Sequence, residues 1–273
     1  MNAPAPTDPG TPPKRRIRGR ALIPLAVLAP VVLAGCQLPS FGAYRGATSQ
    51  GQDAFKLWQG FFIAGLVVGG FVFLLIVWAV FRYRKNKKSE GLPRQTQYRP
   101  MIEVLYTVIP ILVVMGLFAF TVITENEVDA VPSTKVTIDV TAFQWGWQFY
   151  YPATGKVVIG QTLQQPQMVL PVNEAVTIHL ESADVYHGFY VPAFNFSRYA
   201  APGYVNTFNF NVLHTGTYRG QCTQLCGLYH SLMLFSVRAV SPGVFETWVH
   251  RTSGHHPTIG QLKNQIHASG PGA

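Results

Sequence analysis

The stretch FFIAGLVVGGFVFLLIVWAVF, Phe61 to Phe81, decides the architecture, because it is apolar throughout and carries no charge. As a helix it is long enough to cross about 30 Å of hydrocarbon. A second apolar run, Met101 to Ile123, follows it and is interrupted only by Glu103 near its start and by Pro110. The two runs predict a transmembrane helix hairpin over residues 57–124.

The segment between the two runs is strongly basic. It holds one acid, Glu90, against seven cationic residues: Arg82, Arg84, Lys85, Lys87, Lys88, Arg94 and Arg99. Segments of this kind stay in the cytoplasm. We therefore expect a cytoplasmic loop over residues 82–99, with everything after Thr124 on the outer side of the membrane. The basic residues flank apolar segments instead of forming a basic folded face, so nucleic-acid binding is not expected.

The N-terminal region predicts export. A basic stretch, KRRIRGR (14–20), precedes the apolar stretch ALIPLAVLAPVVLA (21–34), which is too short to span a bilayer. This order is typical of a signal peptide. The stretch ends in Leu-Ala-Gly-Cys36, which resembles a bacterial lipobox. We expect a lipoprotein-type signal peptide over 1–35, a lipidated Cys36 and an outer segment over 36–56. The alternative is a cysteine that happens to close an apolar run.

From Ser133 the hydrophobic pattern changes to period two. Four stretches alternate or are rich in β-branched residues, and turn residues separate them: 135–145, 175–182, 205–214 and 232–240. Several short strands without a long helix are typical of a β-sandwich or barrel. The sequence thus predicts an all-β domain over 125–241 and a tail over 242–273, with little ordered structure beyond Val249.

The stretch QCTQLCGLYHSLM places Cys222, Cys226, His230 and Met233 close together. A disulfide is one interpretation, because an exported domain permits it. A disulfide would not need the nearby histidine or methionine. Structural zinc sites use cysteine and histidine and seldom recruit a thioether. Thiolates with an imidazole and a weak methionine ligand favour copper.

Two thiolates can bridge two copper ions, and each ion then needs its own imidazole. The second histidine must come from another loop, and His187 in DVYHGFYVP is the best candidate among eight histidines. His179 alternates within a strand, and His214 opens a turn. The others lie in the tail: His250, His255, His256 and His267.

These residues resemble subunit II of the haem–copper oxidases, of the cytochrome c oxidase type that carries the binuclear CuA centre. The late Cys-x3-Cys-x3-His-x2-Met with an upstream histidine is met in full. Glu103–Pro110 is similar to the opening of the family's second transmembrane helix, and Gln144–Trp147 is similar to its aromatic patch. The resemblance runs from about Phe55 to Val240. It implies a cupredoxin-like Greek-key sandwich behind the hairpin.

The resemblance also implies the copper ligands. Cys222 and Cys226 would bridge two coppers, and His187 and His230 would be the terminal imidazoles. Met233 would be a weak axial ligand to one copper, and the backbone carbonyl of Gln224 would be the weak ligand to the other.

Two further roles follow from the same resemblance. Trp145 would accept electrons near the donor-docking face, the alternative being an ordinary core tryptophan. Glu103 would lie near the mouth of a proton channel into subunit I, the alternative being an interfacial acid at a helix start. Four aromatic residues are expected to limit solvent around the copper: Phe189, Phe194, Tyr229 and Phe235.

The sequence departs from the family at three positions. Gln224 stands where relatives have a magnesium-binding glutamate, and Tyr199 and Tyr204 replace an acid and an arginine beside Pro202-Gly203. An amide is a weaker ligand for a hard cation, so no magnesium site is predicted. The stretch QFYYPATGK lacks the acids that steer a basic cytochrome c. A membrane-bound or complex-attached cytochrome c is the expected donor.

The sequence thus predicts a subunit that takes electrons from cytochrome c and passes them to haem in subunit I, where oxygen is reduced to water and protons are translocated. The subunit itself would make no substrate bond. It would also bind no covalent haem, because the sequence has no Cys-x-x-Cys-His motif. It would lie in the bacterial plasma membrane, in contact with lipid and other oxidase subunits. A quinol oxidase subunit would lack the ligands. A CuA-type nitric oxide reductase subunit and a copper carrier or assembly protein remain alternatives.

Overall fold

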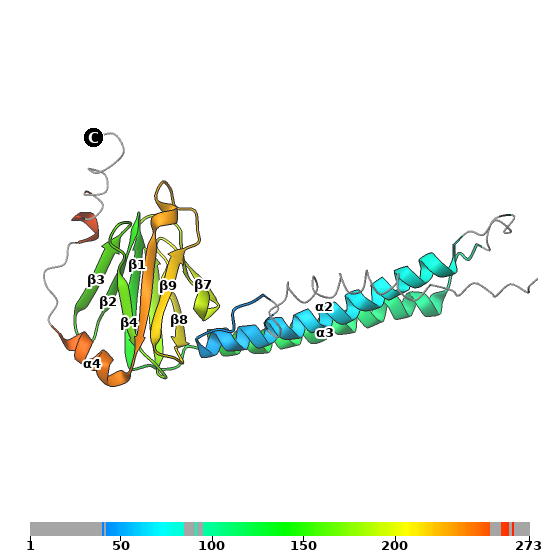
Figure 1. The fold of residues 1–273 in the computed structure, drawn as a ribbon, viewed down its shortest axis with the longest axis horizontal. Helices are drawn as coiled ribbons and strands as arrows, with labels where there is room; N and C mark the ends of the chain where they lie inside the picture. Colours follow the sequence, from blue (N-terminus) through cyan, green and yellow to red (C-terminus); the bar gives the residue numbers. More distant parts are fainter. Residues whose placement is uncertain are drawn as a thin grey trace, which may run out of the picture. The chain divides into compact units, whose positions relative to one another are not determined.

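The structure is a computed structural model that describes residues 40, 42–84, 91, 95–251, 258–261 and 264 (Figure 1). Two long helices precede a β-sandwich, and a short helix follows it. The signal peptide, Cys36 and most of the basic loop lie outside the described residues. The predicted order, a two-helix hairpin followed by an all-β cupredoxin-like sandwich, is confirmed.

The hairpin consists of α2 (Ser49–Arg82) and α3 (Pro100–Asp129). Both are long and apolar enough to cross a membrane by length and composition. Most of their large apolar side chains are exposed, which favours a hydrocarbon environment because such surface is costly in water. Helix α2 begins earlier than the apolar run, because the Thr48 hydroxyl accepts a hydrogen bond from Gly51 N at 3.0 Å and caps the helix.

The sandwich has two five-stranded sheets. The first has the order β3-β2-β1-β5-β8 and the second β4-β10-β9-β6-β7. Strand β1 pairs antiparallel with β2 and parallel with β5. Strand β10 pairs antiparallel with β9 and parallel with β4. The strands are β1 (Val136–Phe143), β2 (Gly146–Tyr151), β3 (Lys156–Gln161), β4 (Gln167–Pro171), β5 (Ala175–Ser182), β6 (His187–Val191), β7 (Phe196–Ala200), β8 (Asn206–Asn211), β9 (Gly216–Cys222) and β10 (Leu234–Val240).

Aromatic side chains from both sheets fill the core next to the cysteines. The Phe189 and Phe235 rings stack at 4.7 Å, and the Trp147 ring lies 5.0 Å from Phe235. All three are fully buried. Gly220 leaves the space for Phe235, because a Cβ at that position would lie 2.2 Å from its ring. Truncating such a residue to alanine costs about 3–5 kcal/mol. This packing supports the end of the sandwich where the motif lies.

Part of the predicted tail belongs to the folded domain. Helix α4 (Pro242–His250) buries Phe245 and Val249 against the sandwich core. The Lys156 ammonium lies 4.4 Å from the centre of the Trp248 ring and donates to the Trp248 carbonyl at 3.1 Å. These contacts keep the chain ordered to His250, which agrees with the predicted limit at Val249, but they extend the folded domain past the predicted boundary at residue 241.

Candidate metal centre

Three strand ends bring the predicted ligands together. His187 begins β6, Cys222 ends β9, and Met233 directly precedes β10. Strands β9 and β10 are antiparallel partners, so the segment between them returns to its starting point. The Cys222 N–H donates to the Met233 carbonyl at 3.0 Å and closes it. Residues 222–233 form the ligand loop.

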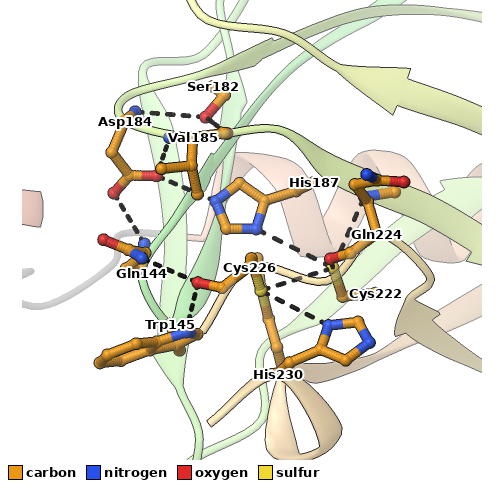
Figure 2. Close-up of polar contacts among 12 residues, drawn as sticks. Gln144, Trp145, Ser182, Asp184, Val185, His187, Cys222, Gln224, Cys226 and His230 are labelled. Carbon is orange, nitrogen blue, oxygen red and sulfur yellow. Dashed lines mark hydrogen bonds and ion pairs between the residues drawn. The ribbon is translucent and has the colours of Figure 1, made fainter. Parts of the chain in front are cut away.

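Within the loop, the short helix η2 (His230–Leu232) turns His230 back toward Cys226. His230 Nδ1 lies 3.5 Å from Cys226 Sγ, and His187 Nδ1 lies 3.9 Å from Cys222 Sγ. Each histidine is therefore beside a different cysteine (Figure 2). The Met233 sulfur lies 3.9 Å from Cys226 Sγ. The spacing in sequence and the arrangement in space agree.

The two thiols are free and lie 3.9 Å apart. A disulfide has a sulfur–sulfur distance of about 2.0 Å, so none is formed here. Metal–thiolate distances are about 2.3 Å, so one ion can contact both sulfurs. The ligand atoms of His187, Cys222 and Cys226 lie within 4.8 Å of one another and are buried. The Gln224 carbonyl oxygen lies 3.3 Å from Cys222 Sγ. This donor set fits soft metal ions such as copper.

The electrostatics of the site favour a thiolate at Cys222. The hydrogen bond from Cys226 holds the pKa of Cys222 at about 3, against the opposing effect of burial, and His187 adds to the lowering. The same hydrogen bond raises the pKa of Cys226. Burial lowers the pKa of His187, but hydrogen bonds with Asp184 and Cys222 outweigh it, so the net direction is upward.

Asp184 orients His187. Its Oδ1 lies 2.9 Å from His187 Nε2, so the ring donates from Nε2 and presents Nδ1 to the cysteines. Oδ1 also accepts from the Val185 N–H at 2.7 Å, and Oδ2 accepts from the Gln144 N–H at 2.8 Å. The Gln144 side chain donates in turn to the Cys226 carbonyl at 2.7 Å. The Asp184 carboxylate thus connects the predicted ligand His187 to the segment that contains Gln144.

Trp145 is partly buried at the margin of the core and lies against the ligand loop. Its Nε1 donates to the Cys226 carbonyl at 3.1 Å, and its ring meets the Tyr229 ring edge-on at 5.1 Å. Gly227, with a φ of +119°, permits this approach, because a Cβ there would come within 2.9 Å of the indole. Trp147, two residues on, is fully buried. The contrast disfavours the interpretation of Trp145 as an ordinary core residue.

Gln224 and Trp145 lie on opposite sides of the cysteine pair (Figure 2). Tyr199 is the cross-strand partner of Gly188, whose missing side chain faces Thr223 and Gln224. Cross-strand partners share a face of the sheet, so Tyr199 lies on the same face as this part of the loop. An amide and a phenol are poor ligands for a hard cation. The prediction that no magnesium ion binds here stays a prediction.

The remaining predicted residues lie elsewhere. Glu103 is in the first turn of α3, where its Oε1 accepts a hydrogen bond from the Arg99 N–H at 2.9 Å. This contact favours the helix-start interpretation, and the proton-channel role stays a prediction. Phe189 pairs in register with Cys222, whereas Phe194 packs on Phe210 and Tyr218.

Sequence reasoning missed three supporting residues. Asp184 lies three positions before His187, a spacing that could have suggested the pair. Gln144 was noted only as part of an aromatic patch. Trp147 was noted in the same patch, yet its ring lies 6.4 Å from the His187 ring and helps to bury it. The links from Asp184 to Gln144 and from Gln144 to the ligand loop, and the place of Trp147 beside His187, depend on the pairing of distant segments.

Comparisons with known proteins agree with the geometry. Residues 154–240 match the family described as cytochrome c oxidase subunit II, periplasmic domain, and residues 40–122 match its transmembrane domain. A probable cytochrome c oxidase subunit 2 of Nocardia farcinica is 31% identical, with coverage of 88% of this chain and 84% of the relative. The chain belongs to the cytochrome c oxidase subunit II family. The predicted family is thereby confirmed.

Other members of the subunit II family are similarly close. Cytochrome c oxidase subunit 2 of Mycobacterium tuberculosis is 32% identical over 87% of this chain and 82% of its own length. A solved periplasmic domain of subunit II from Bradyrhizobium japonicum is 36% identical and covers 44% of this chain and 94% of its own, with a TM-score of 0.40. As a family member, this subunit is a membrane protein with a periplasmic domain and part of an oxidoreductase complex.

Proposed function

We propose that this subunit holds a binuclear copper centre, CuA, and transfers electrons from a c-type cytochrome to haem in subunit I. One observation carries the proposal: two adjacent thiols each have their own histidine, with a thioether and a backbone carbonyl at the periphery. Two cysteines with one imidazole each match the needs of two metal ions that share both sulfurs. Its family membership favours this function over a nitric oxide reductase subunit or a copper carrier.

When bound, the copper pair supplies one-electron storage that is shared between two metals. The chain supplies the rest. Cys222, Cys226, His187 and His230 would hold the two ions, and Met233 and the Gln224 carbonyl would be weak ligands. The buried aromatic residues exclude water, which keeps the surroundings nearly unchanged when the charge changes. Each electron leaves one donor cytochrome oxidised and reaches subunit I, where oxygen is reduced to water and protons are translocated. No substrate bond forms in this chain.

Trp145 marks the side from which electrons come. Its indole connects the protein surface to the Cys226 carbonyl through one hydrogen bond. Gln224, on the opposite side, would face subunit I without a magnesium ion. We place the subunit in the bacterial plasma membrane with the sandwich on the outer face, and Cys36 would carry a lipid after removal of the signal peptide.

The test uses the full-length chain in detergent, loaded with copper. We expect about two coppers per chain and an electron paramagnetic resonance hyperfine pattern of one unpaired electron shared equally between two nuclei. Cys226→Ser should convert this to a mononuclear pattern or remove the copper, whereas His214→Asn, in an exposed turn, should change neither. A single copper with a mononuclear pattern in the unaltered chain would contradict the proposal.

A further inference from the structure

The surface around Trp145 has almost no charge. Three segments meet there: 144–151, 182–191 and 221–234, joined by the contact of Asp184 with Gln144 and of Trp145 with Cys226. None of them contains lysine, arginine or glutamate, and Asp184 is their one carboxylate. A docking surface built to steer a basic protein would need several exposed acids. The three described segments lack them.

The single acid is turned inward. The Asp184 carboxylate accepts hydrogen bonds from the Gln144 and Val185 N–H groups and from the His187 ring, and its side chain is only 15% exposed. The charged Asp184 carboxylate therefore interacts with groups inside the metal site instead of facing outward. The nearest exposed carboxylate along these segments is that of Glu181, at the end of β5. One rim acid gives little long-range attraction at physiological salt, where screening acts within about 8 Å.

Several of the exposed side chains there are apolar. Leu228 is 69% exposed, Tyr186 57% and Val185 37%. Leu228 lies between Gly227, which touches the Trp145 ring, and Tyr229, which packs on that ring. Val185 and Tyr186 directly follow Asp184, which accepts a hydrogen bond from the Gln144 N–H. Exposed apolar and aromatic side chains grouped at one place mark interaction surfaces.

We propose that Trp145, Val185, Tyr186, Leu228 and Tyr229 form an uncharged docking surface for a c-type cytochrome whose haem edge is surrounded by apolar side chains instead of lysines. The inference rests on the electron-transfer role proposed above and specifies its partner. The haem edge of such a cytochrome would lie against Trp145, one hydrogen bond from the Cys226 carbonyl.

Association rates indicate how such a partner would deliver electrons fast enough for enzyme turnover. Without charge steering, association proceeds at about 10⁵–10⁶ M⁻¹s⁻¹, against 10⁸–10⁹ with it. At micromolar concentration the slower rate allows only about 0.1–1 encounters per second. A partner held at the membrane or within the same complex has an effective concentration in the millimolar range, which allows about 10²–10³ encounters per second. That range matches ordinary enzyme turnover, so an uncharged surface suits a tethered donor.

The experiment uses the purified oxidase complex and two probes that differ only in surface charge. One is a strongly basic soluble cytochrome c, and the other is the same cytochrome with its lysines acetylated. Stopped-flow reduction of the copper centre is followed at low and high ionic strength. We expect the two probes to react within about threefold of each other and each rate to change less than about twofold with salt. A basic probe that is at least about tenfold faster at low salt, and slows steeply as salt rises, overturns the proposal.

Variants sharpen the test. Leu228→Glu adds an acid to the surface and should make the basic probe several-fold faster at low salt, with a new salt dependence, while the acetylated probe gains nothing. The matched control is Val244→Glu on α4, which follows the opposite end of β10 and is also an exposed aliphatic residue. It should leave both rates unchanged. Equal responses to the two variants contradict the assigned position of the surface.

Failure of this inference can be told apart from failure of the copper assignment. The same complex is reduced with a small diffusible phenylenediamine, which needs no docking surface. A normal binuclear spectrum and normal reduction by this compound, together with charge-steered reduction by the basic cytochrome, reject the docking proposal alone. Absence of the binuclear spectrum rejects the function on which it rests.

Discussion

Asp184 pairs with His187, and Asp139 pairs with His179, and in both pairs a carboxylate oxygen lies 2.9 Å from a ring nitrogen. The surroundings differ. The side chains of the first pair are 15% and 0% exposed, and those of the second are 38% and 42% exposed. The second nitrogen of His187 faces Cys222, whereas His179 is a strand residue opposite Asp139 in the β1–β5 register. The same contact therefore orients a ligand in one place and joins two exposed side chains in the other.

The oxygen–nitrogen distance within an ion pair therefore does not reveal the role of the pair. An exposed pair is screened by water and is worth about 0–1 kcal/mol. A buried carboxylate that fixes the tautomer of a ligating histidine typically changes metal affinity by about 10–100-fold. Burial and the environment of the second ring nitrogen separate the two cases.

The largest difference between the pairs should appear when the histidines are removed. His187→Ala takes a terminal ligand from the proposed centre, and copper affinity should fall by more than about 100-fold, with loss of the shared hyperfine pattern. His179→Ala should leave both unchanged. Competition with a copper chelator and electron paramagnetic resonance measure the two variants. Retention of the binuclear pattern in His187→Ala would show that another residue supplies the imidazole.

Removing the carboxylates should give the next largest difference. Asp184→Asn keeps a single acceptor oxygen, so it loses either the hydrogen bond from the Gln144 N–H or those from the Val185 N–H and the His187 ring. It also no longer bears a charge beside His187. Copper affinity should fall by about 10–100-fold, with an altered hyperfine splitting. Asp139→Asn is the matched control, with the same chemistry at the same distance, and should have no effect on copper. Similar losses in both variants would mean that Asp184 acts through general stability.

The contrast between these pairs also shows what the sequence could and could not predict. The ligand-loop residues were predictable, because a soft-metal motif occupies one short segment. The link from Asp184 to Gln144 was not, because it joins positions 40 residues apart. Strand β5 was predicted at its observed bounds, since AVTIHLES alternates. Strands β2, β3, β4, β6, β7 and β9 lie outside the four predicted stretches. Strand β2 is mostly aromatic and β9 contains two glycines, so neither alternates clearly.

The tie between Gln144 and the ligand loop should have a smaller effect. Gln144→Ala removes one hydrogen bond to the Cys226 carbonyl but leaves the one from Trp145. A single neutral hydrogen bond is worth about 0.5–1.5 kcal/mol, so copper affinity should fall by about 2–10-fold. Gln148→Ala, in the same hairpin, serves as the control. A loss as large as that of Asp184→Asn would indicate that the carboxylate acts mainly through Gln144 and only secondarily through His187.

The smallest effect is expected at the exposed pair itself. A double-mutant cycle of Asp139→Asn and His179→Asn, followed by chemical unfolding of the full-length chain in detergent, should give a coupling of about 0.2–1 kcal/mol that shrinks with added salt. Both residues lie on neighbouring strands and are in direct register, so the cycle isolates the contact without disturbing the core. A coupling above about 2 kcal/mol, insensitive to salt, would mean that solvent screens this pair far less than its exposure indicates. In that case burial would not be what separates the two pairs, and the orientation of His187 toward the cysteines would have to carry the whole distinction.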